Sequence, residues 1–163
     1  MDIDQLPRFP LAQLPTPIAK LERLSRELAG PELLIKRDDQ TGLALGGNKT
    51  RKLEFLVGHA LAQAADTLVT LGAAQSNHCR QTAAAAAAAG LKCELILNGK
   101  QPEVPNGNLL LNELFGATAH WIERSQRAAK LKSLDEDLRA AGRKPYLIPV
   151  GGSNGIGAVG YVV

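Results

Sequence analysis

Two lysines three residues apart, Lys49 and Lys52, are the side chains of this sequence whose chemistry is easiest to anticipate. They lie in the segment GGNKTRK, where an apolar helical pattern begins, so one face of a helix should carry both. Two ammonium groups at that separation repel each other and burial acts in the same direction, so the pKa of one lysine should fall. A lysine with a lowered pKa is a nucleophile toward carbonyl groups. The other lysine, with the free N–H groups of a helix start, suits a phosphate.

A ligand with both an aldehyde and a phosphate would use the two lysines together, and pyridoxal phosphate is such a ligand. It would also explain why Lys49, Arg51 and Lys52 are placed at a helix start, where cations are locally unfavourable. The alternative is a solvent-exposed basic turn, which spacing alone favours because runs of charge usually lie on the surface.

The segment GAAQSNHCRQ, residues 72–81, follows an apolar run and combines a helix cap with polar side chains. Ser76 or Asn77 should cap the helix, which leaves backbone N–H groups for a carboxylate, and Asn77 could donate to a phenolate oxygen. His78 is either a proton carrier or a hydrogen-bonded wall residue, and Ser76 is a nucleophile only if a base lies nearby. An ordinary capped helix is the simpler alternative.

A third segment, GGSNGIGAVGY at residues 151–161, is rich in glycine and follows a predicted strand. It has the glycines of a phosphate-binding loop but not the order GxGxxG, so by itself it is a weak signal. The alternative is that it only carries the chain toward another domain.

Apolar periodicity predicts the elements that must position these segments. Strands are expected at 67–72, 92–98, 117–122 and 144–150, and helices from 49, from 76 to 90, from 108 to 116, from 125 to 142 and from 151. A short buried strand is expected at 32–39, and Ser125 is expected to cap its helix. The alternation indicates an α/β fold, a parallel four-stranded sheet with flanking helices on both faces. Ligands of such sheets bind beyond the carboxyl ends of the strands, where the second and third segments begin.

Composition narrows the class of protein. Hydrophobic residues make up 45% of the chain, which suits a packed core, and aromatic residues only 4%, which disfavours base stacking. The net charge of +3 is spread along the chain, so no nucleic-acid partner is expected. Cys79 and Cys93 form no CxxC pair, so we expect no metal site and no disulfide, a structural role for Cys79, and a cytoplasmic protein. The sequence shows neither a signal-peptide pattern nor an apolar stretch of membrane-spanning length, so no membrane partner is expected.

Together the three segments resemble one family, the D-cysteine desulfhydrase and 1-aminocyclopropane-1-carboxylate deaminase group of pyridoxal-phosphate enzymes, which has the tryptophan synthase β-subunit-like fold. The matching stretches are LPTPI (14–18), IKRDD (35–39), GGNKTRKLEF (46–55), GAAQSNHCRQTAAAAA (72–87) and PVGGSNGIGAVGY (149–161). They span nearly the whole chain in the expected order. SNH followed by RQTA is more similar to D-cysteine desulfhydrases and related sulfo-lyases than to the deaminases, which look more like SNQ at this place.

The resemblance implies roles for five residues. Lys49 would form the Schiff base with pyridoxal phosphate, Lys52 would contact the phosphate, and Asn77 would bond the O3′ of the ring. Ser76, Asn77 and His78 would cradle the substrate carboxylate. Ser76 corresponds to a serine with a nucleophilic or proton-transfer role in the family.

The implied activity is that of a D-cysteine desulfhydrase-like lyase, which turns D-cysteine and water into pyruvate, hydrogen sulfide and ammonia. The implied partners are a small amino-acid substrate and a second copy of the chain in a homodimer. Alternatives within the family are 1-aminocyclopropane-1-carboxylate deaminase, in which Ser76 assists ring opening, and L-cysteate sulfo-lyase. The alternative outside the enzymes is an inactive α/β fragment or an interaction module.

Members of the family are roughly twice as long as this chain, so the chain is expected to be the N-terminal half of a two-domain enzyme. Residues 1–53 are expected to belong to the large cofactor domain and residues 54–155 to form the small α/β domain. Residues 156–163 are expected to begin a helix that leads to a C-terminal region. The resemblance places the rest of the phosphate cup, the group facing the pyridine nitrogen and the later tyrosines in that region.

Overall fold

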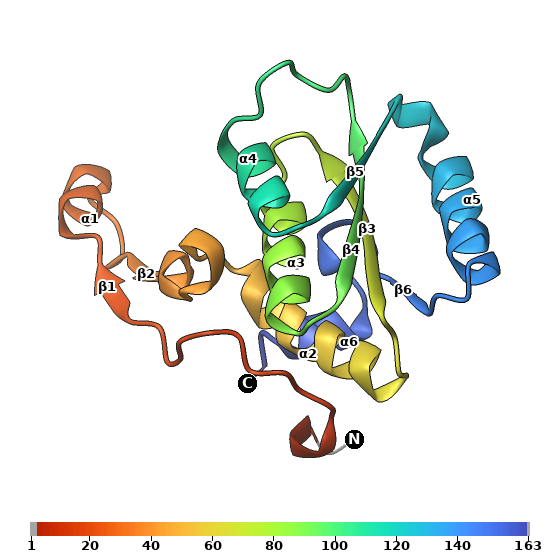
Figure 1. Ribbon diagram of the computed structural model, residues 1–163. Coiled ribbons are helices and arrows are strands. Elements are labelled where there is room, and N and C mark those ends of the chain that lie inside the picture. Colours follow the sequence, from red (N-terminus) through yellow and green to blue (C-terminus); the bar gives the residue numbers. More distant parts are fainter. Residues whose placement is uncertain (1–2, 163) are drawn as a thin grey trace.

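The computed structural model, which describes residues 3–162, is built on a four-stranded sheet with the order β5-β4-β3-β6 (Figure 1). The strands are β3 Thr67–Ala73, β4 Lys92–Asn98, β5 Thr118–Ile122 and β6 Pro145–Leu147. All three neighbouring pairs are parallel, and the strand order reverses at β3, which has β4 on one side and β6 on the other. The predicted parallel four-stranded sheet is confirmed.

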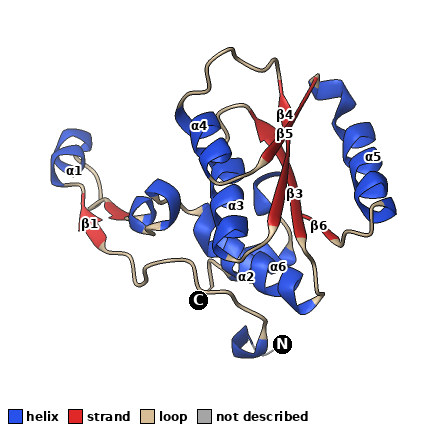
Figure 2. Ribbon diagram, viewed as in Figure 1, coloured by secondary structure: helices blue, strands red, loops and turns tan. Residues whose placement is uncertain are grey.

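Helices cover both faces of this sheet, as Figures 1 and 2 show. One face carries α2 Lys49–Ala62, α3 Asn77–Ala88, α4 Gly107–Leu114 and α6 Gly155–Val159, and the other carries α5 Arg127–Ala140. Within residues 3–162, no helix is both long and apolar enough to cross a membrane.

The two faces of the sheet bury different side chains because successive residues of a strand point to opposite sides. Leu68 and Leu95 belong to the apolar cluster beneath the four helices. Val69 and Ile96 belong to a second cluster beneath α5, which presents Leu131, Leu134 and Leu138. The predicted apolar face of the 125–142 helix is therefore confirmed, and β3 is buried on both sides, as a central parallel strand should be.

The residues before α2 include an arm that projects from the sheet in Figure 1. The arm contains β1 Ile18–Lys20, α1 Glu22–Leu28 and β2 Leu34–Lys36, and its two strands pair antiparallel. Several of its large apolar side chains are exposed: Ile18, Leu24, Leu28, Leu34 and Ile35. The strand predicted at 32–39 is confirmed, but the prediction that it is buried is wrong. A two-stranded pair cannot bury its side chains without a covering layer, and all three residues of β2 are exposed.

Ser125 does not cap the helix that follows it, so that prediction is wrong as well. The cap is Glu123, which begins the short 3₁₀ helix η4 Arg124–Gln126, and α5 starts directly after it. Glu123 and Gln126 form a capping box, in which each side chain bonds the backbone N–H of the other. The paired side chains satisfy two helix-start donors, and Ser125 lies one step inside the turn.

Helix α2 connects the arm, the N-terminal segment and the sheet. The buried carboxylate of Glu54 accepts hydrogen bonds from the backbone N–H groups of Leu11 at 2.8 Å and Ala12 at 2.7 Å. It also pairs with Arg8 at 2.7 Å, so the N-terminal segment is fixed along α2. The predicted domain boundary at 53/54 falls inside this helix and the one at 155/156 falls inside α6. Both stay predictions, and their outermost residues 1, 2 and 163 lie outside the described range.

Gly160 and Gly155, at the two ends of α6, are a matched pair for testing how α6 packs on α2. A β-carbon on Gly160 would lie 2.1 Å from the carbonyl oxygen of Arg51, whereas one on Gly155 would meet no atom within 4 Å. Gly160→Ala should therefore lower the free energy of unfolding by about 1–3 kcal/mol, because α6 must move away from α2. Gly155→Ala should change it little. Urea denaturation measures both, and equal values would contradict the close contact.

Candidate active site

Lys49 and Lys52 lie at the start of α2, which confirms that a helix begins within the GGNKTRK segment. Lys49 Nζ donates a hydrogen bond to Asn48 Oδ1 at 3.2 Å. Lys52 Nζ donates to the carbonyl oxygen of Gly151 at 3.1 Å and to Ser153 Oγ at 3.0 Å. Lys52 therefore joins the first segment to the glycine-rich third segment.

The loop before α2 needs glycine at two positions because it lies against neighbouring backbone and against α3. A β-carbon on Gly46, which has φ 72°, would lie 1.9 Å from the carbonyl oxygen of Asp39. One on Gly47, which has φ 130°, would lie 2.3 Å from Gln81 Nε2. Thr50 Oγ1 donates to Gln81 Oε1 at 2.9 Å, so the first and second segments are in direct contact.

The charge state of Lys49 depends on its surroundings. Burial lowers the pKa of the Lys49 ammonium below its usual 10.5, and the nearby charge of Lys52 lowers it further. The expectation that one of the two lysines has a lowered pKa is therefore confirmed, with burial as the larger cause and repulsion as the smaller. More of this amine is uncharged at neutral pH than of an ordinary lysine, as a nucleophile requires.

Replacing Lys52 by methionine should raise the pKa of Lys49, because the repulsion disappears while the burial remains. The pH midpoint of the Lys49 signal should move upward in an NMR titration of ¹³C-methylated lysines. Lys132→Met is the control, since Lys132 is exposed on α5, and it should leave the midpoint where it is. A midpoint that stays or falls in Lys52→Met would show that the two amines do not interact.

Ser76 is the cap of α3, as predicted for Ser76 or Asn77. Its Oγ accepts a hydrogen bond from the N–H of Cys79 at 3.2 Å, and its carbonyl oxygen accepts from the N–H of Arg80 at 3.1 Å. The first N–H groups of a helix have no partner inside it, so those of Asn77 and His78 remain for a ligand. The start of α3 thus has the cap and the free backbone N–H groups that the sequence predicts, and their binding of a carboxylate stays a prediction.

His78 is buried, and its tautomer follows from its neighbours. Thr70 Oγ1 donates its proton to the carbonyl oxygen of Ile148 at 3.0 Å, so it must accept from His78 Nε2 at 2.9 Å. Nδ1 then carries a lone pair and has no partner among the described residues. Burial, with the charges of Lys49 and Lys52, lowers the pKa of His78 to about 4, so the ring is neutral. These contacts favour a wall residue over a proton carrier.

The glycine-rich segment closes over the two lysines. A β-carbon on Gly151, which has φ 67°, would lie 3.7 Å from Lys49 Cε. One on Gly152, which has φ 62°, would lie 3.5 Å from both Lys52 Cδ and His78 Cε1. The structure therefore brings the three segments together where the starts of α2 and α3 meet the loop after β6.

Two residues at this meeting point were not predicted. Asn48 Nδ2 donates to the hydroxyl of Tyr161 at 2.8 Å, and Lys52 Nζ lies 5.6 Å from the centre of the Tyr161 ring. Burial raises the pKa of the Tyr161 hydroxyl. Asn48 and Tyr161 are far apart in the sequence and share no spacing rule, so no local signal could have paired them.

The two cysteines are both buried and free. Burial raises the pKa of Cys79 to about 11 and raises the pKa of Cys93 as well. Neither thiol is therefore available as a thiolate nucleophile, which confirms the structural role expected for Cys79.

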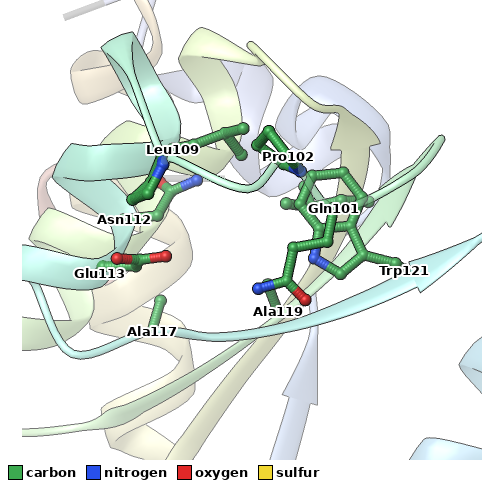
Figure 3. A pocket seen from close by; sticks show the side chains of 10 residues that line it. Gln101, Pro102, Leu109, Asn112, Glu113, Ala117, Ala119 and Trp121 are labelled. Carbon is green, nitrogen blue, oxygen red and sulfur yellow. The ribbon is translucent and has the colours of Figure 1, made fainter.

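A small hollow lies elsewhere, between α4, β5 and the loop that precedes α4 (Figure 3). Its volume of about 30 Å³ suits a water molecule rather than a cofactor. Asn112 lines it and is buried, with Oδ1 and Nδ2 both lacking a partner among the described residues. The two lysines do not line this hollow, so it is separate from the candidate active site.

The chain is similar to known proteins over nearly its full length. A family model described as "Pyridoxal-phosphate dependent enzyme" matches residues 10–163. The D-cysteine desulfhydrase of Klebsiella pneumoniae is 51% identical over 171 residues, which cover 99% of this chain and 52% of the relative. That of Serratia proteamaculans is 51% identical over 164 residues, 97% of this chain and 49% of the relative. A crystal structure described as an ACC deaminase homologue has a TM-score of 0.89 at 44% identity and covers 98% of this chain and 49% of its own.

The chain thus spans about half the length of the curated relatives it matches. Its parallel sheet and flanking helices are those of the ACC deaminase homologue over that half. The matched residues 10–163 include all three segments that meet at the lysines. The chain therefore belongs to the family of pyridoxal-phosphate-dependent enzymes.

Proposed function

We propose that the protein to which this chain belongs is a D-cysteine desulfhydrase, which converts D-cysteine and water into pyruvate, hydrogen sulfide and ammonia. The observation that carries the proposal is Lys49, a half-buried lysine with a lowered pKa that lies close to the start of α3. The two curated relatives that are 51% identical to this chain support the choice of substrate.

The residues around Lys49 suit pyridoxal phosphate. Lys49 offers an amine to the aldehyde, and Lys52 with Ser153 offers a cation and a hydroxyl to the phosphate. Gly152 lets the loop lie against Leu56, Lys52 and His78, where a side chain would be too large. Asn77, exposed at the start of α3, can donate to the O3′ of the ring. When bound, the group supplies an electron sink for reactions at the α-carbon of an amino acid.

The start of α3 is assigned to the substrate carboxylate in this proposal. The N–H groups of Asn77 and His78 donate to it, as at other helix starts that bind anions. Ser76 Oγ already accepts from Cys79, so its own proton is free for the carboxylate or for proton transfer at the substrate. His78 contributes its backbone N–H. Its neutral ring only lines the site, because the ring is hydrogen-bonded to Thr70.

Lys49 is also the base of the proposed reaction. Burial and Lys52 favour its uncharged form, and the positive end of the α2 dipole acts in the same direction. Its Nζ can therefore take the proton from the substrate α-carbon and hold it while sulfide leaves.

The remaining assignments extend the same proposal. Residues 1–53 are assigned to the large cofactor domain, residues 54–155 to the small α/β domain and residues 156–163 to the connection with a C-terminal region. The protein is proposed to act on small amino acids as a cytoplasmic homodimer. The free thiols of Cys79 and Cys93 support a reducing compartment, and the family resemblance supports the dimer.

A second candidate is 1-aminocyclopropane-1-carboxylate deaminase, which the solved ACC deaminase homologue at 44% identity favours. Product analysis with added pyridoxal phosphate separates the candidates. A desulfhydrase releases sulfide and pyruvate from D-cysteine, a deaminase releases 2-oxobutanoate from the cyclopropane acid, and an L-cysteate lyase releases sulfite.

Replacing Ser76 by alanine should lower the rate of sulfide release by roughly 10²–10⁴-fold, as expected for a lost proton-transfer group. Ser133→Ala, an exposed serine on α5, is the control and should keep the rate. If the protein binds the cofactor and releases only 2-oxobutanoate or sulfite, the desulfhydrase assignment is wrong. If the protein binds no pyridoxal phosphate, the result supports the alternative of an inactive α/β fragment.

A further inference from the structure

The side-chain amide of Asn77 is held in one orientation by two neighbours. Arg80 Nη1 lies 3.3 Å from Asn77 Oδ1, and Asn108 Nδ2 lies 2.9 Å from the same oxygen. A guanidinium has only donors, so the Asn77 atom that faces Arg80 must be the carbonyl oxygen. Both hydrogen bonds therefore end on Oδ1, and no described residue accepts from Nδ2.

Asn108, at the start of α4, is fixed by the same logic. Its Oδ1 accepts from Arg80 Nη1 at 3.0 Å, so its Nδ2 must be the group that donates to Asn77 and, at 2.8 Å, to the carbonyl oxygen of Gln75. Its backbone N–H donates to Gln75 Oε1 at 2.9 Å. Gly107, with φ 51°, leaves room for this contact, since a β-carbon there would lie 2.7 Å from Gln75 Oε1.

Arg80 is a buried cation without a carboxylate partner among the described residues, and only 8% of it is exposed. Its Nη2 donates to the carbonyl oxygen of Gly46 at 2.8 Å. All its hydrogen bonds thus go to neutral oxygens of Gly46, Asn77 and Asn108. Burying an unpaired guanidinium is unfavourable for stability. We therefore look for the role of Arg80 in the groups that it hydrogen-bonds.

We propose that Arg80 and Asn108 are positioning residues that hold the Asn77 amide with Nδ2 toward the O3′ of pyridoxal phosphate. The proposal rests on the proposed function. The reverse orientation would place an acceptor, Oδ1, against a negatively charged oxygen. A cation on Oδ1 also polarises the amide, which makes Nδ2 a stronger donor. Because Arg80 bonds Gly46 as well, one side chain fixes both the segment before Lys49 and the donor to O3′.

The first test uses the protein without cofactor. We compare the side-chain amide signals of Asn77 and Asn108 in ¹⁵N–¹H spectra of the wild type, Arg80→Lys and Asn108→Leu. The control is Arg124→Lys, an exposed arginine beside α5. The Asn77 signals should shift in both variants, because each removes one of the two donors to Oδ1, and should stay in the control. If they stay in Arg80→Lys as well, Arg80 does not hold the amide.

The second test uses the bound cofactor. Donation by Nδ2 favours the deprotonated O3′, so the pH midpoint of the visible absorbance band should rise in Arg80→Lys and Asn108→Leu. The Kd for pyridoxal phosphate should increase about tenfold in each. Asn77→Leu, which removes the donor itself, should give the largest change, and Arg124→Lys none.

The outcomes separate this proposal from the proposed function. Shifted amide signals with an unchanged midpoint would overturn the positioning role, because the amide would be held without effect on O3′. A wild-type protein with no visible band would overturn the proposed function and the O3′ part of this proposal. The spectra without cofactor would still decide whether the amide is held.

Discussion

Replacing Lys49 by alanine should abolish the covalent retention of pyridoxal phosphate. Lys49 is the lysine that burial and a neighbouring cation drive toward the uncharged form, and its Cε lies under the Gly151 loop. Without its amine no other group at the site can form an imine in the same place, so any sulfide release should fall by roughly 10²–10⁴-fold or more. The measurement is borohydride reduction of the loaded protein, denaturation, and intact mass with peptide mapping. The wild type should carry one adduct on Lys49 and the variant none.

Three further variants make this result specific. Lys49→Arg keeps a cation but has no nucleophilic amine, so it should also carry no adduct. Lys52→Ala should weaken binding but keep the adduct on Lys49, because its assigned partner is the phosphate. Lys132→Ala, on the exposed face of α5, should behave as the wild type. An adduct found on Lys52, or retained in Lys49→Ala, would show that the wrong lysine has been assigned.

Replacing Asp38 by alanine should lower the free energy of unfolding by about 3–5 kcal/mol, the largest stability effect that we expect. Asp38 holds Arg51, which lies between Lys49 and Lys52 in the sequence, through two hydrogen bonds of 2.8 Å each. Thr16 Oγ1 joins them by donating to Asp38 Oδ1 at 3.0 Å and accepting from Arg51 Nη2 at 2.9 Å. Only 9% of the Arg51 side chain is exposed, so without Asp38 its charge would be buried unpaired. Urea denaturation measures the change.

Asp39 gives a matched control, since it pairs with Arg37 on the surface, where 57% of its side chain is exposed. Asp39→Ala should change stability little, because water screens exposed pairs. If Asp38→Ala and Asp39→Ala behave alike, the buried pair does not anchor the start of α2.

The same pair predicts a pH dependence. The hydrogen bond from Arg51 is the main cause that lowers the pKa of Asp38 below its ordinary 3.8 in the folded protein. A carboxyl group with a lowered folded pKa stabilises the protein above its ordinary pKa and loses this effect as the pH falls through the folded value. The difference in stability between the wild type and Asp38→Ala should therefore be full at neutral pH and shrink below about pH 4.

The elements of the sheet could be predicted from periodicity, but their spatial order could not. Alternating strands and helices imply parallel pairs, and crossovers between them are right-handed. With that handedness, the face that a helix covers decides to which side the next strand is added. Helices α3 and α4 cover one face and α5 the other, so β6 lies on the opposite side of β3 from β4. The apolar residues of α5 do not reveal which face they cover.

The site was predictable where its signals were local. Lys49 and Lys52 lie three positions apart, and Ser76 lies where an apolar run gives way to a helix, so their places at two helix starts followed from the sequence. Spacing alone favoured an exposed basic turn for the two lysines, and the family resemblance was needed to single them out as a candidate site. Arg80 lies inside a segment that the sequence singles out, yet its role could not be predicted. Its partners Gly46 and Asn108 are 34 and 28 positions away, and only the folded chain brings them together.

The strand order also has a consequence for synthesis on the ribosome. β3 is the first strand of the sheet to emerge, and its second edge pairs with β6, the last. One edge of a buried parallel strand therefore stays open until residues 145–147 have left the exit tunnel, and open edges of this kind recruit other chains. Ile148, whose carbonyl oxygen fixes the Thr70 hydroxyl and with it the His78 tautomer, arrives directly afterwards. The nascent chain thus covers the second edge of β3 and completes one wall of the candidate active site in the same step.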